Sequence, residues 1–426
     1  MKNPPPSFGS IISRIARSLY SFLLFGGAQG AAQLATFIYN IIIARWLGPA
    51  EFSIFAALYS VVGLSSVFIN WGLDTWLPHE GGKNSQQLSS LTARVVQIKM
   101  AFGAVWAVLL LLILPWVRPD LFSLLFVLVC ALDLWMESLN NTALTAMNIG
   151  RKIPQIFVSL ALSRGGRLLG AAGLIWLKQD FILYFLLIRF FSTLLSLAYS
   201  CHVVRMEARQ ILMSPLRLTW RKALPYGFSD MLTLVYAQID TTLLVFLAGD
   251  TAVGFYTPAV GMINGLISIL GSAFSFYLPR LSRLWQQDRD KYRRASGWFM
   301  VGLAGLGVAT FLLLQLGADR IIRVLLEEQY APSAVVLKVL SYVILLKSFS
   351  FGFAGLLVSC GRQKDRLIPQ ATSALVNVIL NSMLIPMLNV IGSSFAYVAS
   401  ELVLMVGYGL FSARQSGTSD QPASDG

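Results

Sequence analysis

The chain has 426 residues, of which 56% are hydrophobic and only 12% are charged, with a formal net charge of +13 at pH 7 and a mean hydropathy of +0.67. Soluble globular domains carry roughly 25% charged residues, so this composition excludes an ordinary soluble enzyme or binding domain and predicts an all-α polytopic membrane protein. Two histidines far apart and three scattered cysteines exclude a zinc or histidine-based catalytic cluster and a disulfide framework.

The first 18 residues are predicted to form a cytoplasmic tail that carries an amphipathic helix. The stretch SIISRIARSL places isoleucine and leucine side chains opposite Arg14 and Arg17, a pattern typical of a helix lying in the membrane interface. The apolar segment that follows is too long for the apolar core of a signal peptide, so we expect the first helix to remain in the mature protein.

Twelve membrane-spanning helices are predicted, because about 20 mostly apolar residues are needed to cross a bilayer. In chain order they lie at 19–44, 52–75, 95–117, 120–147, 153–177, 181–201, 223–248, 252–279, 297–316, 334–358, 367–388 and 393–411. Of the lysines and arginines, about five lie in the predicted external loops and about 22 in the tails and cytoplasmic loops. This bias places both termini in the cytoplasm and accounts for most of the positive charge without a nucleic-acid partner.

The long basic connection 205–222 divides the predicted spans into two lobes of six helices each. The N-terminal lobe covers 19–204 and the C-terminal lobe covers 223–411. The polar tail 412–426 is poor in apolar residues and is expected to be disordered.

The two lobes carry short internal repeats in the same order. WLGPAEFSIFA at 46–56 aligns with LAGDTAVGFYT at 247–257, and GRKIPQ at 150–155 resembles GRQKDRLIPQ at 361–370. Because each half has an even number of spans, both insert with the same orientation, which predicts parallel repeats with a substrate site at their interface near mid-bilayer. This organisation indicates a transporter that works by alternating access.

Several of these motifs resemble one known family. IIIARWLGPAEFSIFAALYSVVGL resembles the first hairpin of the polysaccharide transporters, or O-antigen flippases, in the multidrug/oligosaccharidyl-lipid/polysaccharide (MOP) exporter superfamily. QIDTTLLVFLAGDTAVGFYTPA, LPRLSRLWQQDRDKYRR, LLEEQYAPSAVVLKVLS and NVILNSMLIPMLNVIGSSFAYVASE resemble later corners and loops of the same family. Leu326 and Val390 depart from the family pattern, which often has glycine at both positions.

The resemblance implies a MATE-like fold and a function. It implies a bacterial inner-membrane flippase for an oligosaccharide linked to undecaprenyl pyrophosphate, such as an O-antigen, capsule or exopolysaccharide repeat unit. It further implies a protein that is not an enzyme and needs no cofactor beyond possible coupling to H⁺ or Na⁺. The expected partners are the lipid-linked glycan, membrane lipids and polysaccharide polymerase or export machinery.

Four cations near the middle of predicted spans are candidates for binding the pyrophosphate, because a guanidinium or ammonium group matches phosphate oxygens. These are Arg164, Arg167, Arg189 and Lys347. Arg164 and Arg167 are three residues apart and share a helix face. Gly166 and Gly170 lie on a different side of that helix, where they favour close packing against a neighbouring helix.

Four acidic residues within the spans have two possible roles, and the sequence leaves both open. Asp133, Glu137, Asp240 and Glu401 either neutralise the buried cations in static ion pairs or couple transport to H⁺ or Na⁺. Two further lysines, Lys99 and Lys338, lie close enough to span ends for their ammonium groups to reach the interface.

Four polar residues are candidates for facing the sugar, although polar packing between helices explains them equally well. They are Gln33, Tyr39, Asn40 and Gln238.

Three alternatives remain beside the flippase interpretation. A cation-coupled multidrug exporter of the same superfamily would have the same helices but favours an acidic cavity, and the mid-span cations argue against it. A membrane glycan polymerase needs a catalytic constellation on a sizeable external loop, whereas the longest predicted external connection has roughly 17 residues. A non-transporting membrane scaffold is separated from these only by a transport assay.

Overall fold

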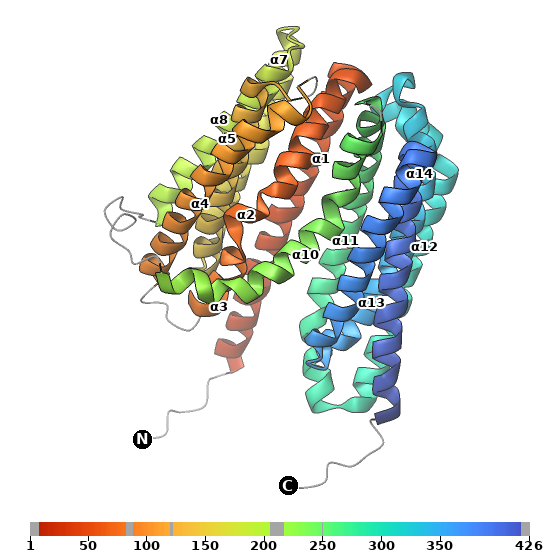
Figure 1. Cartoon of the computed structure of the whole chain (residues 1–426). Helices are drawn as coiled ribbons and strands as arrows, with labels where there is room; N and C mark the ends of the chain where they lie inside the picture. The colour runs from red at the N-terminus through yellow and green to blue at the C-terminus, as the bar shows by residue number, and fades with distance from the viewer. Residues whose placement is uncertain (1–7, 82–87, 120–121, 205–216, 249, 419–426) are drawn as a thin grey trace. The chain divides into compact units, whose positions relative to one another are not determined.

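The fold is described from a computed structural model that covers residues 8–81, 88–119, 122–204, 217–248 and 250–418 (Figure 1). Within these ranges every regular element is a helix. Eight of the helices are long and apolar enough to cross a membrane, so the chain is a multi-pass, all-helical membrane protein, as the composition predicts.

In chain order, the helices fall into two groups, divided at the connection between α8 and α10. Those before the central connection are α1 (Phe8–Ser65), α2 (Val67–Asn70), α3 (Leu73–Gly81), α4 (Leu88–Val117), α5 (Leu124–Ile149), α6 (Ile153–Leu160), the π-helical turn η2 (Ala161–Gly165), α7 (Gly166–Trp176) and α8 (Ile182–Val204). Those after it are α10 (Arg217–Leu247), α11 (Asp250–Gln287), α12 (Arg289–Leu326), the short η3 (Glu328–Tyr330), α13 (Pro332–Ser359), the short η4 (Gln363–Arg366) and α14 (Leu367–Thr418).

Two of the long helices contain a break that separates two predicted spans. In α1 the backbone is non-helical at Gly48, where φ is 73°, and Pro49 follows directly. A positive φ is readily adopted by glycine, and proline at the next position starts a new helical turn. In α14 the break is at Asn389, where φ is 52° and ψ is −130°.

The predicted span 153–177 is one helical stretch that contains a π-helical turn. The backbone stays in the right-handed helical region where α6 passes into η2 and where η2 passes into α7. Because this turn divides the stretch into short elements, none of them is among the eight span-length helices. In α10 the part Gln238–Leu247 is a shorter apolar helix. The predicted total of twelve spans therefore stays a prediction.

The chain forms two compact units, which differ in composition from the predicted lobes. The first unit comprises Met1–Tyr39, Phe68–Ile113 and Leu124–Gly227, and the second comprises Asn40–Val67, Leu114–Ser123 and Phe228–Gly426. Residues 40–67 and 114–123, which the sequence assigns to the N-terminal lobe 19–204, thus group with the C-terminal helices.

Three predicted segments fall partly outside the described residues. The tail 1–18 is described from Phe8, where α1 begins, and the linker 205–222 is described from Arg217, where α10 begins. The C-terminal tail differs from the prediction, because α14 continues to Thr418 and makes residues 412–418 helical. No proline interrupts this extension.

Each unit has its own packing core. In the first unit α5 packs along α8, and α3 packs on α5. In the second unit α13 packs along α11, α12 and α14 (Figure 1). Of the intramembrane charges that the sequence singles out, α5 and α8 carry Asp133, Glu137 and Arg189, and α13 and α14 carry Lys347 and Glu401.

Candidate functional site

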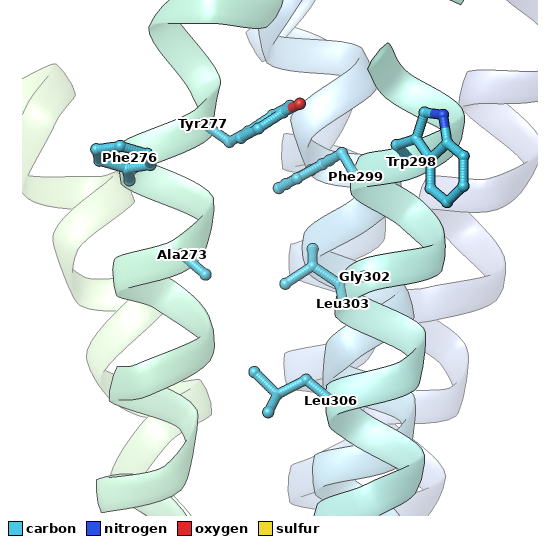
Figure 2. A pocket seen from close by; sticks show the side chains of 8 residues that line it. All are labelled: Ala273, Phe276, Tyr277, Trp298, Phe299, Gly302, Leu303 and Leu306. Atoms are coloured by element: carbon cyan, nitrogen blue, oxygen red, sulfur yellow. The ribbon is translucent and has the colours of Figure 1, made fainter. Parts of the chain in front are cut away.

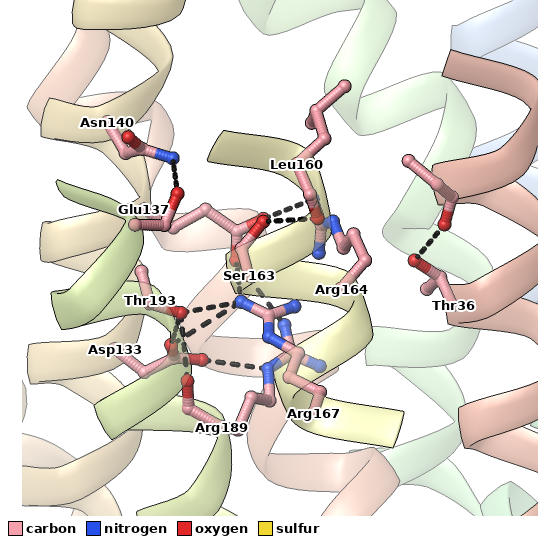
Figure 3. Close-up of polar contacts among 12 residues, drawn as sticks. Thr36, Asp133, Glu137, Asn140, Leu160, Ser163, Arg164, Arg167, Arg189 and Thr193 are labelled. Carbon is pink, nitrogen blue, oxygen red and sulfur yellow. Dashed lines mark hydrogen bonds and ion pairs between the residues drawn. The ribbon is translucent and has the colours of Figure 1, made fainter. Parts of the chain in front are cut away.

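A cluster of charged side chains lies inside the first unit, where three helical segments meet (Figure 3). On α5, Asp133 and Glu137 are one turn apart and face the same side. Arg164 comes from η2 and Arg167 from α7, which directly continues it. Arg189 comes from α8. The structure therefore brings together three of the four predicted phosphate-binding cations and two of the four predicted acids.

The two carboxylates of this cluster are shared among its three guanidinium groups. Glu137 accepts a hydrogen bond from Arg164 Nη2 at 2.6 Å and another from Arg167 Nη2 at 3.0 Å. Asp133 accepts from Arg189 Nε at 2.8 Å. Longer ion pairs join Arg167 to Asp133 at 3.6 Å and Arg189 to Glu137 at 3.5 Å. Among the described residues, three formal positive charges against two negative ones leave the cluster cationic.

Arg167 is the most enclosed of the three arginines and is only partly satisfied. Its side chain is 2% exposed. Its Nη2 donates to Glu137 and to Thr193 Oγ1 at 2.7 Å, while its Nε and Nη1 are buried without a hydrogen-bond partner among the described residues. A buried donor without a partner is costly, so these two nitrogens are suited to an additional acceptor.

Thr193 connects the two halves of the cluster, and the sequence analysis missed it. Its hydroxyl donates to Asp133 Oδ1 at 2.6 Å and accepts from Arg167. Its position, four residues after Arg189 on the same helix face, was the available signal. Asn140 and Ser196, which bond each other at 3.0 Å, extend the polar row along α5 and α8.

The predicted glycine face of α7 packs closely, as expected. A Cβ on Gly166 would lie 2.9 Å from Ser192 Oγ, and one on Gly170 would lie 2.5 Å from Ile188. Both neighbours belong to α8, so the absence of side chains lets α7 approach α8 closely. This approach brings Arg167 within reach of Thr193.

The fourth predicted cation, Lys347, belongs to a separate pair in the second unit. Its Nζ bonds Glu401 Oε2 at 2.7 Å, and Ser350 donates to the other carboxylate oxygen at 2.7 Å. Glu401 is fully buried. The four cations therefore divide into a three-arginine cluster and a lysine–glutamate pair.

Asp240 lies elsewhere in the second unit, in a polar environment of neutral groups. It is buried, accepts a hydrogen bond from the Tyr256 hydroxyl and accepts the Thr241 backbone N–H at 2.8 Å. Within the described residues, no ion pair is formed by Asp240. Ser393, on α14, donates to Asn381 at 2.9 Å.

The prediction that the ammonium group of Lys99 reaches the interface is wrong. Its side chain is 0% exposed and does not reach the interface. Instead its Nζ bonds Asp74 Oδ2 at 2.7 Å and the Ser138 carbonyl at 2.9 Å, and Thr142 donates to the other oxygen of Asp74. Lys338 has 35% of its side chain exposed and pairs with Asp319, as a residue near a span end can.

The predicted sugar-facing residues differ in burial. Gln33 is exposed, and Tyr39 is buried, where it donates to the Phe185 carbonyl at 3.4 Å. Tyr39 is also close enough to Arg189, Arg167 and Asp133 to interact with them electrostatically. The remaining two, Asn40 and Gln238, are half-buried.

Comparison with known proteins identifies similar chains at two levels. A family model described as "Polysaccharide biosynthesis protein" matches residues 18–285. No curated protein matches the sequence significantly. Among solved structures, an inward-facing multidrug resistance MATE family transporter of the MOP superfamily has a TM-score of 0.75 at 11% identity, over 93% of this chain and 100% of that one.

Two further solved structures have the same fold. The lipid II flippase MurJ, in an inward closed conformation, has a TM-score of 0.71 at 14% identity, over 92% of this chain and 87% of that one. A MOP superfamily transporter from Pyrococcus furiosus has a TM-score of 0.62 at 12% identity, over 94% of this chain and 96% of that one. At these identities the likeness shows the fold, which is that of the MOP exporters.

Proposed function

The chain belongs to the polysaccharide biosynthesis protein family, and from this membership we propose that it is a flippase for a polyprenyl-pyrophosphate-linked oligosaccharide. The proposed cargo is an O-antigen, capsule or exopolysaccharide repeat unit, moved across the bacterial inner membrane by alternating access. One of its fold neighbours is a lipid II flippase, which supports a lipid-linked substrate.

This proposal rests on the guanidinium group of Arg167, which has hydrogen-bond donors without acceptors in the described part of the chain. Two of its nitrogens are buried without a partner among the described residues, in a cluster that holds one more cation than it holds carboxylates. Phosphate oxygens are suitable acceptors for these two nitrogens, because guanidinium groups bind phosphate bidentately. The excess positive charge favours an anion over a neutral or cationic ligand.

The chemistry of the cargo explains why such a site would be needed. A pyrophosphate and several sugar hydroxyls cannot cross hydrocarbon unaided, since each polar group without a partner costs several kcal/mol. The polyprenyl chain can stay in lipid throughout. In this scheme the pyrophosphate competes with Glu137 for Arg164 and Arg167, so that the cluster opens when cargo arrives and closes after release.

Coupling to H⁺ or Na⁺ is proposed for Asp240 in preference to Asp133, Glu137 or Glu401. The other three acids are paired with buried cations. Asp240 is bonded by neutral donors only. A carboxylate of this kind can exchange a proton or a monovalent cation without leaving an unpaired arginine.

A cation-coupled multidrug exporter is the second candidate. All four mid-span cations are in ion pairs. This pairing favours the exporter, because a cation held in a static pair would not be available to bind a phosphate. A MATE transporter is among the fold neighbours.

Deletion of the gene in its own host separates these functions. We expect lipid-linked repeat units to accumulate at the cytoplasmic face, where a membrane-impermeant reagent that labels glycan does not reach them. Arg167→Gln should fail to complement, whereas Lys338→Gln, which removes a cation from an exposed pair, should complement. Unchanged external glycan together with new sensitivity to cationic dyes would instead establish the exporter.

A further inference from the structure

An apolar groove lies between α11 and α12 in the second unit (Figure 2). Ala273, Phe276 and Tyr277 line it from α11, and Trp298, Phe299, Gly302, Leu303 and Leu306 line it from α12. Its volume is about 260 Å³, slightly below the roughly 300–1,000 Å³ of pockets that hold compact drug-sized ligands. The lining is almost entirely carbon, which suits a narrow hydrocarbon chain.

The groove has a rigid floor and an open rim. The floor is set by Phe299, whose ring packs on Gly355 of α13 and stacks on Tyr277, with centroids 5.3 Å apart and planes 5° from parallel. At the rim, 75% of Trp298 and 52% of Phe276 are exposed. Both residues belong to helices that are long and apolar enough to cross a membrane.

One end of the groove is strongly basic. The end of α11, the turn after it and the start of α12 together carry six exposed cations, which are Arg280, Arg283, Arg289, Lys291, Arg293 and Arg294. The carboxylates of the turn are Asp288 and Asp290, and Asp288 is already bonded to Lys291 at 2.8 Å. The turn therefore keeps an excess of positive charge next to an apolar channel.

Two of these arginines continue the groove lining by helical spacing. Arg280 follows Ala273 and Phe276 on one face of α11, and its guanidinium carbon lies 5.5 Å from the centre of the Tyr277 ring. Arg294 precedes Trp298 and Gly302 at successive intervals of four residues on α12. The two arginines thus flank the end of the channel from opposite helices.

We propose that this groove binds one acyl chain of an anionic phospholipid whose phosphate contacts Arg280 and Arg294. Positive residues at a membrane surface attract anionic headgroups, and the aromatic residues Tyr277 and Trp298 are of the types enriched at membrane interfaces. The charge of the turn selects an anionic lipid over a zwitterionic one, and the apolar lining holds its chain. This site is independent of the charged cluster on α5, α7 and α8.

Gly302 offers a substitution that fills the groove without disturbing the helix. A Cβ at this position meets nothing within 4 Å, so Gly302→Leu places its side chain into the channel. Gly305 is the matched control, because a Cβ there also meets nothing within 4 Å and the residue does not line the groove. The double variant Arg280→Gln, Arg294→Gln removes the proposed phosphate contacts while keeping the channel.

Native mass spectrometry of the purified full chain, incubated with defined lipids, tests the proposal. We expect the wild type and Gly305→Leu to retain one phosphatidylglycerol with at least tenfold preference over phosphatidylcholine. Gly302→Leu and the double arginine variant should each lower that retention about tenfold. A phosphatidylglycerol carrying a photoreactive acyl chain should label peptides of α11 and α12.

Three results would overturn the proposal. They are equal retention of the two lipids, unchanged retention in Gly302→Leu, and displacement of phosphatidylglycerol by equimolar polyprenyl phosphate. The last would assign the groove to the tail of the transported lipid.

Discussion

Gly254 on α11 packs directly against Ser53 on α1, the residue that corresponds to it in the internal repeat of the sequence. A Cβ on Gly254 would lie 3.3 Å from the Cβ of Ser53 and in steric conflict with the Pro49 carbonyl. The segments 46–56 and 247–257, which align with each other in sequence, therefore contact each other through equivalent positions. Both segments belong to the second unit.

Any side chain larger than hydrogen at Gly254 should destabilise this contact. We expect Gly254→Val to lower the free energy of unfolding by about 1–3 kcal/mol through overpacking. The control is Gly261→Val on the same helix, where a Cβ meets nothing within 4 Å. Thermal unfolding in detergent measures both, and equal melting temperatures for the two variants would show that the helices can separate without cost.

In the arginine cluster, loss of an acid should cost more than loss of a base. Glu137→Gln leaves three guanidinium groups around Asp133 alone, and breaking a buried pair in this way costs about 3–5 kcal/mol. Arg167→Gln leaves two cations and two carboxylates, so its loss of stability should be smaller. Denaturation of the two variants in the same detergent gives the order, and the opposite order would mean that the excess charge is neutralised by something else.

The buried pair between Lys99 and Asp74 should be strongly coupled. A cycle of Lys99→Met, Asp74→Asn and the double variant is expected to give a coupling free energy of about 0.5–3 kcal/mol. The exposed pair between Lys338 and Asp319 is the control and should give about 0–1 kcal/mol. A coupling at Lys99 no larger than the control would argue that its charge is satisfied by the Ser138 carbonyl alone.

Asp240 and Glu401 should respond differently when neutralised. Asp240→Asn keeps its shape and its neutral neighbours, so we expect normal folding but at least a tenfold loss of the dependence of transport on the H⁺ or Na⁺ gradient. Glu401→Gln leaves Lys347 unpaired and should reduce the amount of folded protein. Flux into proteoliposomes with and without each gradient is the measurement, and unchanged gradient dependence in Asp240→Asn would reject its coupling role.

The start of α12 should lose stability in acid. Asp288 caps this helix by accepting the Lys291 backbone N–H at 3.0 Å, and the hydrogen bond from Lys291 lowers the pKa of Asp288 below its ordinary 3.8. A carboxylate with a lowered pKa stabilises the folded state fully above 3.8 and loses this effect as the pH falls through the folded-state pKa.

Thermal unfolding across pH therefore tests the cap. The difference in melting temperature between the wild type and Asp288→Ala should be constant above pH 3.8 and shrink below it. Asp290→Ala, in the first turn of the same helix, controls for general loss of negative charge. A difference that persists unchanged well below pH 3.8 would contradict the assignment.

The sequence predicted the membrane class and the helical fold, and it identified the charged residues within the spans without assigning which acid pairs with which cation. Spacing alone placed Asp133 and Glu137 on one face and Arg164 and Arg167 on another, and static pairing was one of the two roles foreseen for the acids. The ion pairs are present, and whether the arginines also bind phosphate stays a prediction.

Other features of the structure could not be predicted from the sequence. Lys99 lies near a predicted span end, and its partner Asp74 is 25 residues away on a separate short helix, so its burial depends on tertiary packing. The residues of the π-helical turn before Arg167 have no sequence pattern that predicts such a turn. The grouping of residues 40–67 with the second unit follows from contacts such as that between Tyr330 and the Ala44 carbonyl, which lie far apart along the chain.

The shared carboxylates of the cluster also have a consequence for biogenesis. During synthesis Asp133 and Glu137 reach the membrane first, and Arg164 follows Glu137 by 27 residues. Each charge on an isolated helix costs roughly 2.5–3.5 kcal/mol at the bilayer centre, so the charges of α5 and α7 disfavour the insertion of either helix before its partner. Their insertion is expected to be cooperative, with the acidic helix held at the insertion machinery until its basic partners emerge.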